Sequence, residues 1–166
     1  LIMQYNISPE TILGTWQDDI GVEGLLNKEF DTSVWKEKNV TVTPNGSVYR
    51  KDKQGFLTKL MESMYNDRVT YKQLMLEEQK KGRNADPNKL SQYYNYQQNL
   101  KIALNSAYGA MGNQWFRYYD ERNAEAVSVA GQLSVQWAEN AVNNYLNTTL
   151  GTVNKDYIVA MDTDSL

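Results

Sequence analysis

Two long stretches with helical periodicity, separated by a short polar break, constrain the fold of this chain more than any other feature. Across residues 57–81, apolar side chains recur every three or four positions, as on the buried face of an amphipathic helix. Residues 82–86 interrupt the pattern, and Asp86-Pro87 is typical of the start of a new helix. That helix should end at about residues 109–112. Two helices joined by so few residues predict an antiparallel helical hairpin.

The second helical stretch, NLKIALNSAYGAMG, carries an unusual set of polar side chains. Lys101, Asn105 and Tyr108 are spaced i, i+4 and i+7, so they project from one side of a helix, and Gly109 follows at once. A cation, an amide and a phenol in one line are an odd core face. They suit a surface that meets something anionic and planar, such as a nucleoside triphosphate.

The first helical stretch offers two more cations at helical spacing, Arg68 and Lys72. Taken singly, each of these residues is equally typical of an ordinary exposed helix face. Taken together, three cations and an amide on the two helices of one hairpin would bind a triphosphate well. The joint pattern therefore favours a nucleotide site.

Composition narrows the chemistry. The chain has 166 residues, a net charge of −3, no cysteine and no histidine, which excludes disulfides, thiolate nucleophiles, histidine-based triads and ordinary zinc sites within it. Residues 50–83 nevertheless hold nine basic and five acidic side chains, a local charge of +4. The apolar runs are too short for a membrane span.

The residues around the predicted hairpin indicate smaller elements. Residues 39–43 and 47–50 alternate like strands about a Pro-Asn-Gly turn and predict a β-hairpin. Before it, Ser8-Pro9 could start a short helix, and residues 17–38 read as a loop or short helix with aromatic anchors at Trp16, Phe30 and Trp35. After the helical hairpin, residues 124–146 predict another helix. Its buried side should carry Val127, Ala130, Val135, Ala138 and Val142. Residues 157–161 predict a buried strand.

Two carboxylates, Asp162 and Asp164, follow that apolar run directly. Carboxylates this close repel unless a divalent cation lies between or beside them, and oxygen ligands suit Mg²⁺. A two-metal site is a common solution for displacing pyrophosphate from a nucleoside triphosphate. A solvated acidic turn is the alternative, and for this pair alone it is the more common one.

Several of these segments resemble one family. KIALNSAYG resembles motif B of the family B DNA polymerases, and DTDS about fifty residues later resembles their motif C. YNISPETI, TPNGSVYRKD, WFRYYDERNA and NYLN are similar to the replicative polymerases of T-even-type tailed bacteriophages. The resemblance covers nearly the whole chain; residues 14–38 and the hairpin tip match poorly, and the tip is much shorter than in those relatives.

The resemblance implies a role for each matching residue. Arg68, Lys72 and Lys101 would hold the triphosphate of the incoming nucleotide with help from Asn105, and Tyr108 and Gly109 would pack by the nascent base pair. Asp164 would ligate the catalytic Mg²⁺ ions, with Asp162 as its motif partner. These are the residues expected to carry nucleotidyl transfer from a dNTP to a primer 3′ hydroxyl.

The same resemblance implies an α+β fold, with a helical-hairpin fingers subdomain inserted in a partial antiparallel-sheet palm. Residues 1–56 would be a palm segment that follows motif A, residues 57–112 the fingers ending in motif B, and residues 113–166 a palm segment ending in motif C. The expected setting is viral DNA replication in the cytoplasm of an infected bacterium, with primer-template DNA, dNTPs and a sliding clamp as partners.

The motif A aspartate of the two-metal site is expected upstream of Leu1, so the chain is expected to be an internal part of a polymerase and inactive alone. Two alternatives stay open. One is a non-catalytic helical-hairpin module that binds nucleic acid or an acidic protein, and the other is an inactive polymerase remnant.

Overall fold

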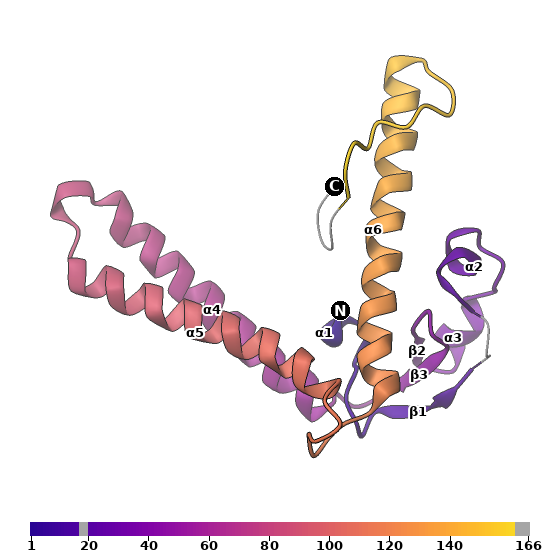
Figure 1. Cartoon of the computed structure of the whole chain (residues 1–166), viewed down its shortest axis with the longest axis horizontal. Helices are drawn as coiled ribbons and strands as arrows, with labels where there is room; N and C mark the ends of the chain where they lie inside the picture. The colour runs from indigo at the N-terminus through magenta and orange to yellow at the C-terminus, as the bar shows by residue number, and fades with distance from the viewer. Residues whose placement is uncertain (17–19, 162–166) are drawn as a thin grey trace.

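The computed structural model describes residues 1–16 and 20–161. Its long helices diverge from a common base: the hairpin of α4 and α5 points one way and α6 another, and a small sheet lies beyond α6 (Figure 1). Helices together with a small antiparallel sheet, without parallel strand pairs in the described ranges, confirm the α+β class. None of the helices in the described ranges has the length and hydropathy of a membrane-spanning segment.

The predicted helical hairpin is confirmed. Helix α4 spans Phe56–Lys80, a 3₁₀ turn η1 spans Gly82–Asn84, and α5 spans Pro87–Met111. Asp86 caps α5 as expected, because its carboxylate accepts a hydrogen bond of 2.9 Å from the N–H of Asn88. Local sequence signals thus define both ends of the break between the helices.

Side chains on α4 also shape the short tip. The buried Glu78 carboxylate accepts from the backbone N–H of Asp86 at 2.9 Å and from the Lys81 ammonium group at 2.6 Å. The Asp86 N–H bond and the Lys81 cation hold the pKa of Glu78 below its ordinary value. One carboxylate therefore closes the turn from which α5 starts.

The sheet contains the predicted β-hairpin and one further strand. Strands β2 (Val40–Val42) and β3 (Ser47–Arg50) pair antiparallel with Thr41 opposite Tyr49. Strand β1 (Ile12–Thr15) pairs with the other edge of β3, which gives the order β1-β3-β2. The chain turns between β2 and β3 at Gly46, whose φ of 80° suits glycine.

The expectation of a short helix at Ser8-Pro9 is wrong. Residues 9–11 form a single turn, in which the Thr11 N–H donates to the Ser8 carbonyl. The Thr11 hydroxyl also donates to the carbonyls of Asn6 and Ser8, at 2.6 and 2.9 Å. These bonds close the turn, and the chain then pairs with β3 instead of continuing as a helix. The short helix lies earlier, as α1 (Ile2–Tyr5).

Residues 20–38 contain the short helices α2 (Val22–Leu26) and α3 (Ser33–Glu37). The predicted aromatic anchors Trp16, Phe30 and Trp35 are confirmed, because they pack around a small buried cluster. The members of that cluster are Ile20, Val42 and Val48.

A second apolar cluster joins the base of the hairpin to the rest of the molecule. It brings together residues from α1, the segment that follows α1, β3, α4, α5 and α6: Ile2, Ile7, Tyr49, Leu57, Met61, Met111 and Ala126. All of its hairpin residues come from the start of α4 or the end of α5. The outer part of the hairpin projects away from this core (Figure 1).

The helix predicted at residues 124–146 is present as α6, which extends further at both ends and spans Glu121–Leu150. Gly151 follows it in the left-handed conformation. The predicted buried side of α6 is only partly right. Ala130 is fully buried and Val142 is 37% exposed, whereas Val127, Val135 and Ala138 are half-buried. The core covers only the first turns of α6. The distal part therefore leaves even Trp137 65% exposed.

The prediction of a buried strand at residues 157–161 is wrong. The segment has no regular structure, and Val159 is 99% exposed. No strand in the described ranges lies beside it to accept its backbone hydrogen bonds. Side chains of α6 bind it instead: Asn143 Oδ1 accepts from the Tyr157 N–H at 2.9 Å, and Asn147 Nδ2 donates to the Lys155 carbonyl at 2.8 Å.

Candidate functional site

A cavity at the base of the hairpin brings together three of the predicted nucleotide-site residues. Arg68 comes from α4, and Asn105 and Tyr108 come from α5. The cavity has a volume of about 390 Å³. Its other walls are mostly apolar and come from the first residue, α1, both hairpin helices and α6: Leu1, Ile2, Met3, Met61, Tyr65, Leu104 and Val127.

Arg68 lies in this cavity half-buried. Its Nε atom is buried and has no hydrogen-bond partner among the described residues. Arg68 also makes no ion pair among the described residues, so the outer nitrogens of its guanidinium group can donate to a ligand. A planar fork of N–H donors matches the oxygens of a phosphate, which is the chemistry predicted for this position.

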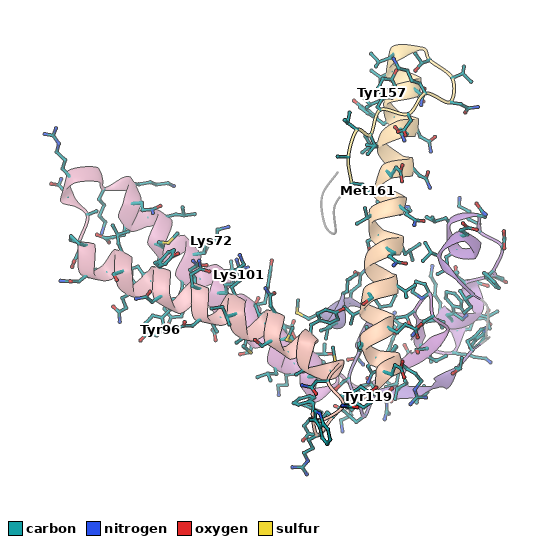
Figure 2. All side chains as sticks on the ribbon, in the orientation of Figure 1. Lys72, Tyr96, Lys101, Tyr119, Tyr157 and Met161 are labelled. Atoms are coloured by element: carbon teal, nitrogen blue, oxygen red, sulfur yellow. The ribbon has the colours of Figure 1, made fainter. Side chains whose placement is uncertain are left out.

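Lys72 and Lys101 do not line the cavity. Both are exposed, and Figure 2 places them at a similar level along the hairpin, farther from its base. The ion pairs found within residues 1–16 and 20–161 join Arg50 to Asp52, Lys81 to Glu78 and Arg122 to Asp120. None of them neutralises Arg68, Lys72 or Lys101.

Tyr108 stands between two cavities. Besides the one that holds Arg68, it lines a second cavity of about 540 Å³ with residues of α6 and with Met161. Its hydroxyl is 2.7 Å from the hydroxyl of Ser128 on α6, and its side chain is 40% exposed. The phenol is thus fixed at one end and open along its ring.

Gly109 follows Tyr108 on an open surface. A Cβ atom built at Gly109 would meet no heavy atom within 4 Å. A planar group could therefore approach the backbone beside the Tyr108 ring without displacing any described side chain.

The predicted metal-binding carboxylates, Asp162 and Asp164, lie outside the described residues. Within residues 1–16 and 20–161, no group of three acidic side chains is arranged to hold a metal ion. Met161, the residue before Asp162, lines the same cavity as Tyr108. The last described residue therefore lies next to the predicted nucleotide site.

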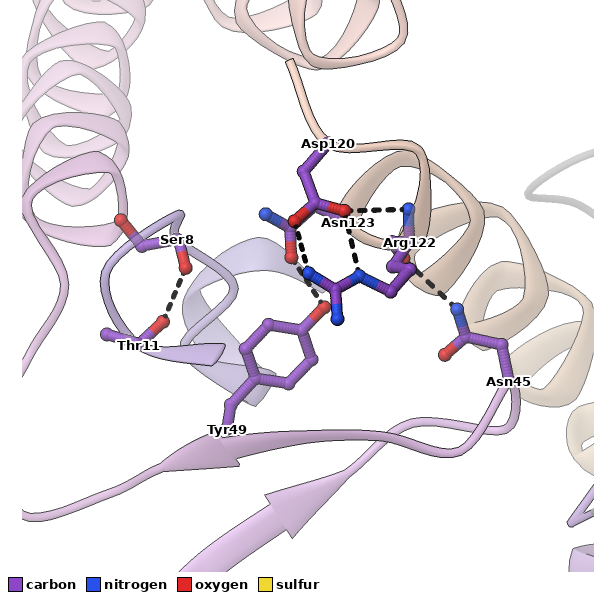
Figure 3. A network of polar contacts seen from close by, with 7 residues as sticks. All are labelled: Ser8, Thr11, Asn45, Tyr49, Asp120, Arg122 and Asn123. Carbon is purple, nitrogen blue, oxygen red and sulfur yellow. Dashed lines mark hydrogen bonds and ion pairs between the residues drawn. The ribbon is translucent and has the colours of Figure 1, made fainter. Parts of the chain in front are cut away.

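A polar network attaches the start of α6 to the sheet. The Tyr49 hydroxyl donates to Asn123 Oδ1 at 2.8 Å, and both side chains are fully buried (Figure 3). Burial raises the pKa of the Tyr49 phenol well above its ordinary value, because the charged form would lose its hydration. Asp120 caps α6 at the Arg122 N–H at 3.0 Å and pairs with the Arg122 guanidinium.

Sequence reasoning missed the partners that hold this site in place. Ser128 gave no signal, since a serine on a helix is usually unremarkable. Asn123 lies in the segment WFRYYDERNA, which resembles the family, but its partner Tyr49 is 74 residues away and could not be predicted. The segment YNISPE did stand out as a family resemblance, but its contacts with α4 could not be read from its pattern.

Comparison with known proteins identifies the protein family. The sequence model of DNA polymerase family B matches residues 1–166, so the chain belongs to that family.

Two relatives stand out among curated proteins. The chain is 32% identical over 212 aligned positions to the DNA-directed DNA polymerase of Escherichia phage RB69, and 31% identical over 211 positions to that of Enterobacteria phage T4. Each alignment covers all of this chain but only 23% of the relative, so the chain spans about a quarter of their length. Both alignments are longer than 166 residues, so the relatives carry inserted positions that this chain lacks.

Proposed function

We propose that this chain supplies the nucleotide-handling part of a DNA polymerase that acts in phage replication. The reaction is nucleotidyl transfer from a dNTP to a primer 3′ hydroxyl on a DNA template. Membership of family B and the names of the two phage relatives support it. The observation that carries the proposal is the cavity in which Arg68, Asn105 and Tyr108, from both helices of the hairpin, lie together beside α6.

In this proposal the hairpin is the fingers subdomain, with residues 57–112. Residues 1–56 and 113–166 are palm segments, which fits the small sheet and the packing of α6 at the hairpin base. Hairpin closure onto a nucleotide would bring its cations to the phosphates.

The triphosphate would lie along the hairpin, with Arg68 at the inner end and Lys72 and Lys101 farther out. Each cation is free of ion pairs within the described residues, so none must give up a carboxylate to bind phosphate. Asn105, in the cavity with Arg68, would donate its amide hydrogens to a phosphate oxygen. Oriented cations of this kind stabilise the charge on a leaving pyrophosphate.

The base end of the nucleotide would lie at Tyr108 and Gly109. The phenol hydroxyl is fixed by Ser128, so the ring keeps one orientation. The open backbone at Gly109 leaves room for a nascent base pair. A fixed ring beside an open backbone would test the width of that pair as the hairpin closes.

Asp164 and Asp162 would hold Mg²⁺ together with a carboxylate outside residues 1–166, and bound ions there would stabilise the attacking and leaving oxygens. Carboxylate oxygens are the donors that Mg²⁺ prefers. Met161 in the Tyr108 cavity supports their placement near the nucleotide. The further partners in this proposal are primer-template DNA and a sliding clamp bound by other regions, in the cytoplasm of the infected host.

The test is primer extension by the complete gene product that carries these residues. Lys101→Ala should raise the dNTP KM about 10- to 100-fold, because a hydrogen bond to a charged group contributes roughly 1.5–3 kcal/mol. Lys80→Ala, which removes an exposed cation near the tip of the same hairpin, is the matched control and should change KM less than about 2-fold. Equal effects of the two substitutions would contradict the assignment of Lys101.

The wild-type protein tests the function itself. Incorporation that requires template, dNTP and Mg²⁺ supports a polymerase. A non-catalytic hairpin module would instead show DNA affinity that falls with rising salt concentration and does not depend on Mg²⁺ or on which dNTP is present.

A further inference from the structure

The first turn of α4 is capped by a distant segment of the chain. The residue before Phe56 is Gly55, which has no side chain to bind the free N–H groups at the start of the helix. Three side chains from residues 6–10 bind them instead. Asn6 Oδ1 accepts from the Gly55 N–H at 2.8 Å, Glu10 Oε1 from Phe56 at 2.5 Å, and Ser8 Oγ from Leu57 at 3.3 Å.

These three side chains, which we term the socket, are themselves firmly held. The Ser8 hydroxyl donates to Glu10 Oε2. Asn6 Nδ2 donates to the carbonyls of Arg50 and Lys53 at 2.7 and 2.9 Å, so it also binds the loop that leads into α4. Ser8 is fully buried and Asn6 is 9% exposed. Every polar end of the socket therefore has a defined partner.

The fit between the socket and α4 is close. A Cβ atom added at Gly55 would overlap the Cβ of Ser8 and would lie 3.0 Å from the Thr11 Cγ2 atom. Partial burial disfavours the charged form of Glu10, but the bonds from the Ser8 hydroxyl and the Phe56 N–H hold its pKa below the ordinary value. Glu10 is thus charged at neutral pH and faces the positive end of the α4 dipole.

The hairpin acts on this socket as a long lever. At 1.5 Å per residue, α4 is roughly 37 Å long, and Arg68 lies about 18 Å from the first residue of the helix. A rotation of about 10° at the base would move Arg68 by about 3 Å and the tip by about 6 Å. A shift of that size separates a phosphate contact from none.

The apolar contacts at the base do not fix this direction alone. Leu57, Met61 and Met111 bury apolar surface there, but hydrophobic contacts are non-directional. Hydrogen bonds to three consecutive N–H groups fix the axis of the helix because each depends on angle.

We propose that Asn6, Ser8 and Glu10 are positioning residues that set the direction of the α4–α5 hairpin, and so determine how readily its cations reach an incoming nucleotide. The consequence for nucleotide use rests on the proposed polymerase function. The consequence for hairpin direction does not.

The first experiment measures direction without catalysis. Spin labels on Arg83→Cys at the tip and Thr148→Cys on α6 report one distance distribution, in a complete gene product whose other cysteines are replaced by serine. Glu10→Ala should broaden or shift this distribution by several ångströms, as the lever predicts. Glu10→Gln keeps an acceptor oxygen for Phe56 and should restore the wild-type distribution. An unchanged distribution in Glu10→Ala would overturn the proposal.

Asp86→Ala is the matched control. It removes a cap of the same kind, but from α5 at the far end of the hairpin. It should leave the position of the hairpin base unchanged. If it broadens the distribution as much as Glu10→Ala does, loss of any cap explains the result and the socket has no special role.

The second experiment measures dNTP kinetics in the same proteins. Glu10→Ala should raise the dNTP KM about 3- to 10-fold with a smaller change in kcat, because the cations reach the phosphates less often. Glu10→Gln should recover most of the loss, and Asp86→Ala should stay within about 2-fold of wild type. If the wild type is active and Glu10→Ala has the same dNTP KM, the inference is contradicted, whereas the proposed function is still supported. A changed distance distribution in a protein without polymerase activity supports the socket and refutes the function.

Discussion

Tyr49 offers the sharpest stability test of how the sheet, the hairpin base and α6 are held together. It lies on β3 with no exposed surface, packs in the apolar cluster that contains Leu57 and Met111, and donates its hydroxyl to Asn123 at the start of α6. Tyr49→Phe removes one oxygen and keeps the ring. The substitution therefore isolates the hydrogen bond from the packing.

The expected cost follows from what is left behind. Asn123 Nδ2 already has no partner within the described residues, and Tyr49→Phe would leave Asn123 Oδ1 unpaired as well. An unsatisfied buried polar group costs about 1–3 kcal/mol. We expect Tyr49→Phe to lower the free energy of unfolding by that amount.

A double-mutant cycle checks the origin of this cost. Asn123→Leu removes the buried amide at similar volume, so in the Tyr49→Phe background it should recover part or all of the loss. The assay is a urea titration of the complete gene product, with the slope of the transition unchanged between variants. If the two substitutions simply add, the hydroxyl and the amide do not interact as the structure shows.

The pH dependence gives a second, independent check. Because burial raises the pKa of Tyr49, the folded protein keeps a phenol proton that the unfolded chain releases above about pH 10. The contribution of Tyr49 is therefore complete below about pH 10 and decreases as pH rises further, by up to about 1.4 kcal/mol per pH unit. Tyr49→Phe should lack this component, so the difference between the two proteins should narrow or reverse at high pH. A constant difference from pH 8 to 11 would refute the reasoning.

Three further expectations concern the hairpin. Gly55→Ala should destabilise the protein by about 1–3 kcal/mol in urea, because the added methyl overlaps Ser8. The methyl group added in Gly109→Ala meets nothing within 4 Å, so this substitution should be neutral or stabilising by up to about 1 kcal/mol. It should nevertheless lower primer extension if a base pair occupies that space. A loss of stability would contradict the open surface at Gly109. The pKa of Glu78 is held low by the Asp86 N–H, so its contribution is present above about pH 4.3 and lost as pH falls below that value. Hydrogen exchange at the tip should show this loss in wild type and not in Glu78→Gln.

The elements that the sequence predicts well are those whose signals are local. Helical periodicity, the Asp86-Pro87 start and the Pro-Asn-Gly turn each act within a few residues, and the helical hairpin and the β2–β3 hairpin are confirmed. Strands that depend on distant partners were predicted poorly. Strand β1 was not predicted, because its partner β3 lies some 37 positions later, as in the pair Ile12 and Tyr49. Residues 157–161 are apolar enough for a strand but have no strand beside them in the described ranges.

The candidate site follows the same rule. The helical spacing of Lys101, Asn105 and Tyr108 was readable from sequence, and the pairing of α4 with α5 brings Arg68 into one cavity with two of them. Which of these side chains would line the cavity could not be predicted from the sequence. Helical spacing gives the face of the helix on which a residue lies, but it does not show that Lys72 and Lys101 lie outside the cavity. The roles assigned to these residues stay predictions until the kinetic variants are measured.

Charge and direction are thus encoded in different parts of this chain. The cations of the hairpin lie on its own helices, whereas the groups that fix the hairpin base come from residues 46 to 49 positions earlier. A substitution at a cation removes a contact with phosphate, and a substitution in the socket keeps every cation but changes where all of them point. The two kinds of variant should therefore differ in a measurable way. Loss of a cation should weaken nucleotide use without changing the tip-to-α6 distance, whereas loss of Glu10 should change both.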